Sequence, residues 1–184
     1  MKFIPQLIPD LILIEPNVHY DDRGYFVETF RQELFLKSVG CKVKFVQENE
    51  SSSSKGVLRG LHYQLPPFSQ SKLIRVTEGN ILDIAVDIRK TSPTFGQHIA
   101  IELSAENMYQ LFIPSGFAHG FLVLSKKAKI NYKVDNYYMP DYDRGIAPID
   151  IKLGINLPFS KDKLHLSKRD QSHPSLFDSS DLFN

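Results

Sequence analysis

The chain has 184 residues and a formal net charge of +1; 42% of its residues are hydrophobic and 23% are charged. This composition predicts one globular domain over residues 1–184 with a substantial core. The balanced charge gives no support to binding of nucleic acid or to attraction to membranes. No segment is apolar over the length of a membrane span, and residues 1–5 lack the pattern of a secretory signal, so we expect a cytoplasmic protein. The single cysteine, Cys41, excludes an intramolecular disulfide and a four-cysteine metal site.

Short strand patterns separated by turns occupy the first quarter of the chain, at residues 11–14, 25–30 and 42–47. Between the second and third patterns, residues 31–38 have helical spacing, and Gly40 is a suitable stop. The four serines at residues 51–54 are too few to form a linker between domains, so they predict a mobile loop.

Strand patterns then recur at nearly regular spacing, at residues 56–64, 72–77, 82–87, 98–103, 109–113, 121–124 and 130–134. Short strands with turn signals between them indicate an antiparallel sandwich or barrel. Within residues 82–87, large apolar residues alternate with acidic or small ones. We therefore expect Leu82, Ile84 and Val86 to face the interior. No glycine-rich phosphate loop is present, which argues against a dinucleotide-binding fold. Residues 164–184 predict a short helix and a tail that pack on the barrel.

The segment 56–64, GVLRGLHYQ, places an arginine and a histidine in an otherwise apolar strand. Burying such groups is costly unless they meet partners. One interpretation is a core histidine whose hydrogen bonds are all made, beside an arginine that reaches the surface. The other is that Arg59 and His62 serve one cavity. Strict alternation would put them on opposite faces because their separation is odd. The second interpretation therefore requires a bulge or bend at Gly60.

Residues 114–119, PSGFAH, fit the second motif of cupin barrels, PxGxxH. The first cupin motif has a His-x-His pair, but here His62 is followed at that spacing by Gln64, and no acidic ligand follows it. Two histidines are fewer than the three protein ligands of a typical catalytic metal site. The motif therefore favours the cupin fold, and we expect no bound metal.

The chain resembles the dTDP-4-dehydrorhamnose 3,5-epimerase family, whose members are all-β, cupin-type jelly-roll barrels with a few short peripheral helices. The order and separation of the matching segments also fit the family. These segments are residues 22–28 (DRGYFVE), 47–49 (QEN), 56–64, 72–76 (KLIRV), 113–121 (IPSGFAHGF), 132–138 with Pro140, and 166–170 (LSKRD). The resemblance implies an epimerase that acts at C3, C5 or both of a nucleotide-linked 4-keto-6-deoxy sugar, for surface-polysaccharide biosynthesis.

The resemblance also implies the catalytic roles. Inverting a centre beside a ketone requires a base on one face, an acid on the other and stabilisation of the enolate between them. His62 matches the family's base, and histidine titrates near neutral pH. Asp170 matches the carboxylate that pairs with this base, Tyr132 the acid on the opposite face, and Lys72 the cation beside the keto oxygen. No metal or redox cofactor is implied.

Other matches concern binding of the nucleotide-diphosphate sugar. Arg59 and His119 match residues that approach the diphosphate or the sugar. Nucleotide- or sugar-binding positions are matched by Gln47, Asn49 and Tyr138. The resemblance also implies a homodimer with exchanged N-terminal strands, because three residues match positions that a partner subunit contributes: Arg23, Phe26 and Glu28.

The chain departs from the family near the end of the barrel. Two tryptophan-containing segments of the family are replaced here by residues 146–150 (IAPID) and 156–158 (NLP), and Ser71 stands where glycine is common. These departures leave open the base (dTDP or GDP), the sugar length and the number of inverted centres. Alternatives are the same chemistry on a GDP-linked 4-keto-6-deoxy-heptose, a 3,4-ketoisomerase, and a non-catalytic sugar-binding barrel.

Overall fold

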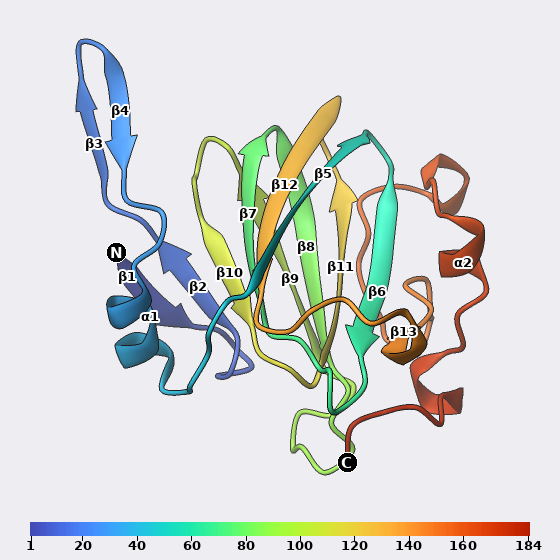
Figure 1. The fold of residues 1–184 in the computed structure, drawn as a ribbon. Coiled ribbons are helices and arrows are strands. Elements are labelled where there is room, and N and C mark those ends of the chain that lie inside the picture. The colour runs from blue at the N-terminus through green and yellow to red at the C-terminus, as the bar shows by residue number, and fades with distance from the viewer.

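The computed structural model describes residues 1–184 and contains two antiparallel sheets that face each other (Figure 1). The six-stranded sheet consists, in spatial order, of β1 (Lys2–Pro5), β2 (Ile12–Glu15), β10 (Gln110–Ile113), β7 (Lys72–Glu78), β12 (Lys127–Val134) and β5 (Gln47–Ser54). The five-stranded sheet consists of β13 (Asp143–Gly145), β6 (Leu58–Gln64), β11 (Phe117–Val123), β8 (Asn80–Asp87) and β9 (His98–Ser104). Two further strands, β3 (Val18–Asp21) and β4 (Gly24–Val27), form a separate hairpin. This is the jelly-roll barrel that the sequence predicted.

The main core lies between the two sheets and comprises 15 buried apolar residues. Ile74 and Ile130 from the six-stranded sheet and Ile81 from the five-stranded sheet are completely buried in it. Burying one such side chain contributes roughly 1.5–3 kcal/mol, so this cluster holds the sheets together. The apolar core occupies only part of the space between the sheets, and polar side chains line the rest.

Strand β8 presents the opposite face to the one predicted. Ile81 and Ala85 face the interior core, whereas Ile84 and Val86 are buried on the outer face, where Leu82 packs beside them. The expectation that Leu82, Ile84 and Val86 face inward is therefore wrong. The C-terminal segment covers the outer face of this sheet, so both faces of the strand are buried and the hydrophobic pattern does not distinguish them.

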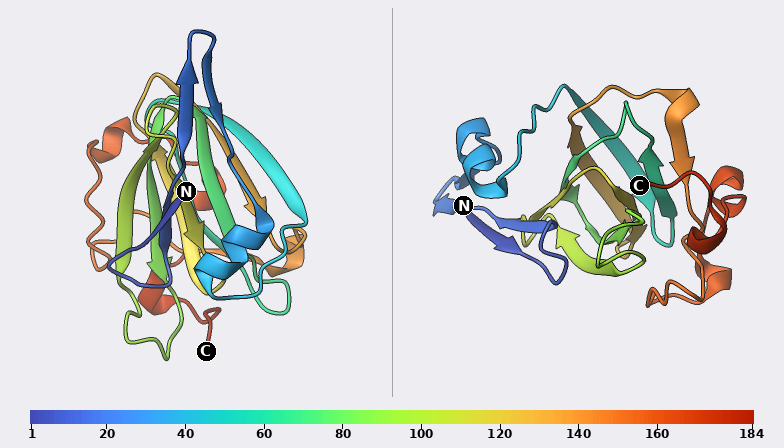
Figure 2. Two further views of the ribbon diagram at one scale, coloured as in Figure 1. Left: turned by 90° about the vertical axis from the view of Figure 1, so that its left-hand side faces the viewer. Right: turned by 90° about the horizontal axis from the view of Figure 1, so that it is seen from below.

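Peripheral helices cover the outer faces of both sheets (Figure 2). The predicted helix is α1 (Gln32–Val39), followed by Gly40 in the left-handed conformation; its Phe35 ring packs edge-on against Phe112, with 5.0 Å between centroids. The other side carries η1 (Pro140–Tyr142), η2 (Lys161–Lys163), α2 (Lys168–Gln171) and η3 (Leu176–Asp178). Of these, α2 and η3 lie within residues 164–184, for which a short helix and a tail are predicted. None of the helices is both long enough and apolar enough to cross a membrane.

The serine-rich segment is a strand, not a loop. β5 pairs with β12 along its whole length, from Gln47 opposite Val134 to Ser54 opposite Lys127. The predicted strand at residues 42–47 and the predicted mobile loop at 51–54 are both wrong. The backbone hydrogen bonds to β12 form this strand irrespective of the type of side chain. Alternate residues of β5 face a polar cavity, so the segment has no apolar face from which a strand could be predicted.

Candidate active site

A bulge in β6 directs two polar side chains into one cavity. His62 pairs with His119 of β11, but between Arg59 and His62 two residues of β6 lie opposite the single Gly120. Gly60, at the bulge, has φ +107°, and a Cβ there would lie 2.6 Å from the carbonyl oxygen of His119. Only glycine fits this conformation and this close approach. The predicted bend at Gly60 is thus present, and Arg59 and His62 line the same cavity.

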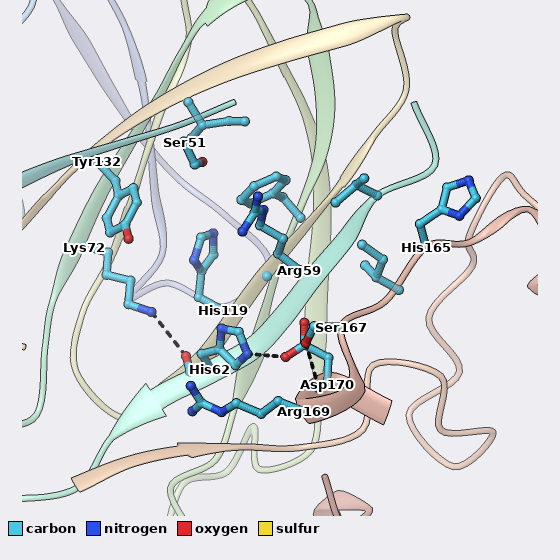
Figure 3. A pocket seen from close by; sticks show the side chains of 15 residues that line it. Ser51, Arg59, His62, Lys72, His119, Tyr132, His165, Ser167, Arg169 and Asp170 are labelled. Carbon is cyan, nitrogen blue, oxygen red and sulfur yellow. Dashed lines mark hydrogen bonds and ion pairs between the residues drawn. The ribbon is translucent and has the colours of Figure 1, made fainter. Parts of the chain in front are cut away.

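The cavity lies between the sheets and has a volume of about 450 Å³ (Figure 3). Six of the predicted site residues line it: Arg59, His62, Lys72, His119, Tyr132 and Asp170. A depression of about 250 Å³ adjoins the cavity and shares His62, Lys72 and Tyr132 with it. Three more predicted residues line this depression: Gln47, Asn49 and Tyr138.

His62 and Asp170 form a short contact at the floor of the cavity. His62 Nε2 lies 2.6 Å from Asp170 Oδ1, and Asp170, on α2, is only 4% exposed. Burial alone would raise the pKa of Asp170, but hydrogen bonds from His62, the Gly60 amide and Ser167, with the His62 charge, lower it below its usual value. Asp170 therefore stays a carboxylate and accepts the Nε2 proton of His62. The other ring nitrogen, Nδ1, has no partner in the protein.

Lys72, on β7, places a weakly solvated cation beside His62. Its side chain is 8% exposed, and its Nζ donates to the backbone carbonyl of His62 at 3.2 Å. Burial lowers the pKa of Lys72 to about 8, although Asp143 and Asp83 act in the opposite direction. At neutral pH the amine is therefore mostly charged, and few other groups solvate that charge.

His119 and Asp83 form a second histidine–aspartate pair, farther inside the barrel. His119 Nε2 lies 2.8 Å from Asp83 Oδ1, and both residues are buried. Burial lowers the pKa of His119 despite the neighbouring carboxylate, which favours a neutral ring that donates its Nε2 proton to Asp83. The two histidines on which a cupin metal site would depend are thus each bonded to an aspartate of their own.

Tyr132 enters the cavity from the sheet opposite His62. It lies on β12 of the six-stranded sheet, whereas His62 lies on β6 of the five-stranded sheet. Figure 3 shows the two side chains on different sides of the cavity. Burial raises the pKa of the Tyr132 phenol, so the hydroxyl keeps its proton at neutral pH.

Several lining residues were not predicted. Ser51, on β5, lines the cavity, and Ser53, two residues further on, supports it: Ser53 Oγ accepts a hydrogen bond from Arg59 Nε at 3.0 Å. Arg169, next to Asp170, lies 2.7 Å from Asp143 Oδ2, which also accepts from Tyr138. His165 lines the far end of the cavity. A period-two pattern that begins at Gln47 would have indicated the serines; for the other residues the sequence carries no signal.

The remaining predicted residues lie away from the cavity. Figure 1 shows the hairpin of β3 and β4 projecting from the barrel. Phe26, on β4, is 71% exposed, Arg23 pairs with Asp21, and Glu28 pairs with Arg31. Within one chain these three residues do not reach the other predicted site residues.

The two segments that depart from the family pattern also lie outside the site. Neither residues 146–150 nor residues 156–158 line the cavity or the adjoining depression. Ile146 is fully buried in the outer cluster, and Leu157 packs against that cluster. The two segments without tryptophan therefore belong to the outer covering of the barrel and not to the lining of the site.

Comparison with known proteins agrees with this geometry. Residues 5–178 match the family model described as dTDP-4-dehydrorhamnose 3,5-epimerase. The chain is 53% identical over 158 residues, 86% of its length and 87% of the relative's, to the dTDP-4-dehydrorhamnose 3,5-epimerase of Shigella flexneri. The crystal structure of dTDP-4-dehydrorhamnose 3,5-epimerase from Elizabethkingia anophelis superposes with a TM-score of 0.94 at 42% identity, covering 97% of this chain and 98% of that one.

A second solved structure, from Legionella pneumophila, has a TM-score of 0.92 at 44% identity and covers 96% of this chain and 93% of that one. That protein is a dTDP-6-deoxy-D-glucose-3,5-epimerase in complex with dTDP-4-keto-L-rhamnose. The family match spans nearly the whole sequence, and both structural matches share its fold. The resemblance in the motifs is thus confirmed: the chain belongs to the dTDP-4-dehydrorhamnose 3,5-epimerase family and is a nucleotide-sugar epimerase.

Proposed function

We propose that the chain inverts C3 and C5 of a dTDP-linked 4-keto-6-deoxy sugar, and that the cavity between the sheets is its active site. One observation carries this proposal: an unpartnered imidazole nitrogen of His62 and the phenol of Tyr132 line one cavity from opposite sheets. Inversion needs a proton acceptor on one face of the sugar ring and a proton donor on the other. A dTDP-linked substrate, and not a GDP-linked heptose, is favoured by the names of the matching proteins.

In the proposed mechanism His62 Nδ1 removes the proton from the carbon beside the ketone. The electron pair of the broken C–H bond moves into the ring, and an enolate forms with its negative charge on the O4 oxygen. The Lys72 ammonium lies beside that oxygen and stabilises the charge, which a buried cation does more strongly than one in water. Tyr132 then gives its phenolic proton to the opposite face of the same carbon.

Asp170 supports the base in two ways. By accepting the Nε2 proton it fixes the tautomer of His62 that has a lone pair on Nδ1. When His62 takes up the substrate proton, the adjacent carboxylate stabilises the imidazolium. The N-cap of α2, in which Ser167 Oγ accepts from the Asp170 amide at 3.0 Å, holds the aspartate in place.

The charges around the cavity suit a diphosphate ester. Arg59 and Arg169 line it together with Lys72, and Asp170, paired with His62, is the acidic residue among the lining residues. Arginine forms paired hydrogen bonds with phosphate oxygens. The nucleoside would then occupy the adjoining depression, where Gln47, Asn49 and Tyr138 offer amide and phenol groups.

A homodimer completes the proposed site. The projecting hairpin exposes the aromatic rings of Tyr20, Tyr25 and Phe26, which is unusual for a segment with no neighbour. If it reaches a second copy of the chain, Arg23 adds a cation and Phe26 a stacking surface to the partner's cavity. Exposed aromatic groups of this kind are typical of protein interfaces.

The proposed reaction is tested by incubating the enzyme with dTDP-4-keto-6-deoxyglucose in deuterated water. NMR spectra of the sugar ring should show deuterium at C3 and C5 and formation of the 3,5-inverted ketose. Exchange at C3 alone would restrict the reaction to one centre. Migration of the ketone from C4 to C3 would contradict the proposal in favour of a ketoisomerase.

A further inference from the structure

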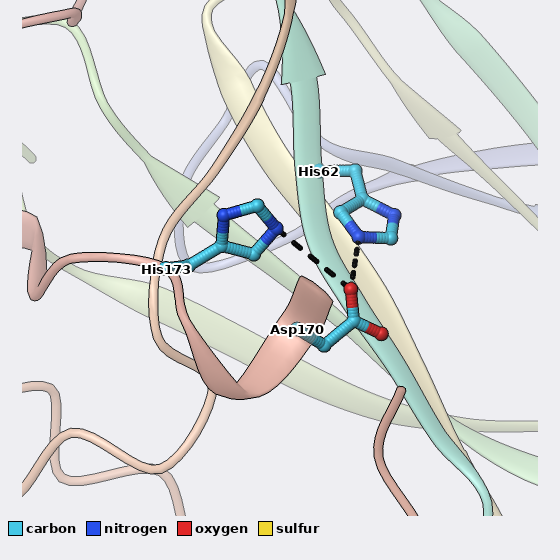
Figure 4. A group of neighbouring side chains, drawn as sticks. All are labelled: His62, Asp170 and His173. Atoms are coloured by element: carbon cyan, nitrogen blue, oxygen red, sulfur yellow. Dashed lines mark hydrogen bonds and ion pairs between the residues drawn. The ribbon is translucent and has the colours of Figure 1, made fainter. Parts of the chain in front are cut away.

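A further histidine, His173, lies behind the proposed base and is not used by the mechanism. His173 follows α2, and its ring lies edge-to-face with that of His62, with 5.7 Å between the centroids. Figure 4 shows both rings directed at the same carboxylate oxygen of Asp170. His173 Nε2 is 3.8 Å from Asp170 Oδ1, too far for a hydrogen bond.

The Nε2 atom of His173 is buried and has no hydrogen-bond partner. An unsatisfied buried polar atom costs about 1–3 kcal/mol, so such an atom in a native protein calls for an explanation. The surrounding structure holds the ring in this orientation. Gly145, on β13, approaches so closely that a Cβ added there would lie 2.4 Å from His173 Nε2.

Three ligand atoms converge at this point: His62 Nε2, Asp170 Oδ1 and His173 Nε2. They all lie within 4.8 Å of one another, and the carboxylate oxygen is 2.6 Å from one nitrogen and 3.8 Å from the other. Around tetrahedral zinc, with bonds of about 2.0–2.1 Å, ligand atoms lie about 3.3 Å apart. The two observed separations fall on either side of this value, and two imidazoles with one carboxylate form a common zinc ligand set.

We propose that His62, Asp170 and His173 form an inhibitory site for Zn²⁺ or a similar divalent ion, in which the ion replaces the proton shared by His62 and Asp170. A water molecule would complete the tetrahedron. The site differs from the cupin metal position, which would use His62 with His119. The active enzyme would hold no ion here, and binding would switch it off.

The inhibitory consequence rests on the proposed role of His62 as the base. An ion on Nε2 forces the ring proton of neutral His62 onto Nδ1. The nitrogen that faces the substrate then carries a hydrogen and has no lone pair to accept another proton. Asp170 is at the same time drawn to the ion and no longer supports the imidazolium. Abstraction of the ring proton of the sugar should therefore stop.

The depression that His173 lines is not the substrate cavity. His173 lines a separate depression of about 470 Å³, together with Asp143, Gly145, Arg169 and Asp178. Arg169 is the one residue that lines both this depression and the active-site cavity, and His173 does not contribute to the lining of that cavity. Bound nucleotide sugar should not block the ion, so inhibition should lower kcat and leave KM unchanged.

The binding half is tested with Co²⁺ and Zn²⁺ alone, added to the purified full-length protein. Co²⁺ should give the visible absorption of a four-coordinate ion, saturate at one ion per chain and be displaced by Zn²⁺. In His173→Asn the Co²⁺ affinity should fall by at least about 10-fold, since the loss even of an outer-shell partner costs 10–100-fold. The matched control is His98→Asn, which removes a half-buried imidazole from β9 and should leave the affinity unchanged. Unchanged binding in His173→Asn, or an equal loss in His98→Asn, would overturn the site.

The predicted inhibition is tested by the rate at which deuterium enters the substrate from solvent. For each variant, the rate with Zn²⁺ is divided by the rate without Zn²⁺. Wild type should lose exchange on adding Zn²⁺ and regain it with a chelator, whereas His173→Asn should need at least about 10-fold more Zn²⁺. Thermal unfolding checks the fold of the variant, and His173→Gln serves as a second, longer amide replacement. If Co²⁺ binds through His173 but Zn²⁺ leaves exchange intact, the metal site stands and His62 is not the base. If Zn²⁺ raises KM and leaves kcat unchanged, the ion competes with the substrate elsewhere and the proposal fails.

Discussion

His62 and Tyr132 are carried by two different sheets and line one cavity between them. The distance between the two groups is therefore set by how the sheets pack, and not by a flexible loop. In the proposed reaction the sugar ring would lie between the base and the acid with one face toward each sheet. This arrangement makes the stereochemical outcome depend on two side chains that can be changed separately.

Asp170→Asn should remove the charge that supports His62 and leave the shape of the site nearly unchanged. The amide can present its NH₂ group to His62 Nε2, which forces the ring proton onto Nδ1. Proton removal should then be slowed by about 10²–10⁴-fold, the usual contribution of positioned acid–base catalysis. Deuterium wash-in and epimerisation should fall together, whereas calorimetry should show unchanged affinity for dTDP. A wash-in rate within about threefold of wild type would mean that the carboxylate is dispensable.

Lys72→Met should stabilise the protein at neutral pH while it impairs the reaction. The fall of the lysine pKa from 10.5 to about 8 corresponds to about 3 kcal/mol of unfavourable burial of the charge. Loss of the hydrogen bond to the His62 carbonyl offsets about 1 kcal/mol, so a net gain of about 2 kcal/mol is expected at pH 7. The catalytic rate should fall by about 10²–10³-fold through loss of the cation beside the enolate.

The pH dependence of this stability difference gives a further check. Between pH 8 and 10.5 the unfolded chain binds more protons at Lys72 than the folded chain, so this residue makes the wild type more stable as pH rises through that window. The advantage of Lys72→Met should therefore shrink above pH 8 and vanish before pH 10.5, once the burial cost has fallen to about 1 kcal/mol, the contribution of the lost hydrogen bond. Urea unfolding curves at several pH values measure it. Lys129→Met, at a half-buried position of β12 whose side chain is 40% exposed, is the control and should show no such trend. A constant advantage of Lys72→Met from pH 7 to 11 is the result that would contradict a lowered pKa.

Activity should reappear when two different inactive chains are combined. In a dimer that exchanges hairpins, a chain with His62→Asn supplies an intact hairpin to the intact cavity of a chain with Arg23→Ala. Random assembly makes half of the dimers mixed, each with one complete site, so co-expression should restore about a quarter of wild-type activity.

The matched control combines His62→Asn with Asp170→Asn. Both changes lie in the cavity of their own chain, so no mixed dimer has a complete site and no activity should return. The measurement is the specific activity of the unfractionated co-expressed protein; mixed dimers purified through two different tags should reach about half of wild-type activity. No recovery in the first pair, together with a monomer in sedimentation, would refute the exchanged hairpin.

The sequence predicted the parts of this structure where chemistry restricts the residue type. The bulge at Gly60 follows from two polar residues at odd separation in an apolar strand, and helix α1 follows from its spacing and its terminal glycine. Nine of the residues that the family resemblance indicated line the active-site cavity or the adjoining depression.

What the sequence did not predict depends on contacts between distant segments. The orientation of β8 depends on a C-terminal segment that buries its outer face, so the alternation of Leu82, Ile84 and Val86 gave the wrong side. Strand β5 was missed because its inward face is polar where it borders the cavity. His173, which follows α2, contacts both Asp170 and Gly145, and Gly145 lies on the edge strand β13. No local sequence pattern predicts this contact between distant segments.

Tyr132→Phe should separate the two halves of the proposed reaction. The substitution removes one oxygen atom, so the fold and the position of His62 should be kept. His62 can still remove the proton, but the enolate now receives a proton mainly from the side it left, by return from His62. Deuterium should therefore enter the substrate with retained configuration, while net epimerisation falls by about 10²–10⁴-fold. Tyr138→Phe, which removes a phenol from the adjoining depression, should change KM and not the stereochemical course. NMR time courses of wash-in and product formation compare the two rates, and an equal fall of both in Tyr132→Phe would show that this residue is not a dedicated acid.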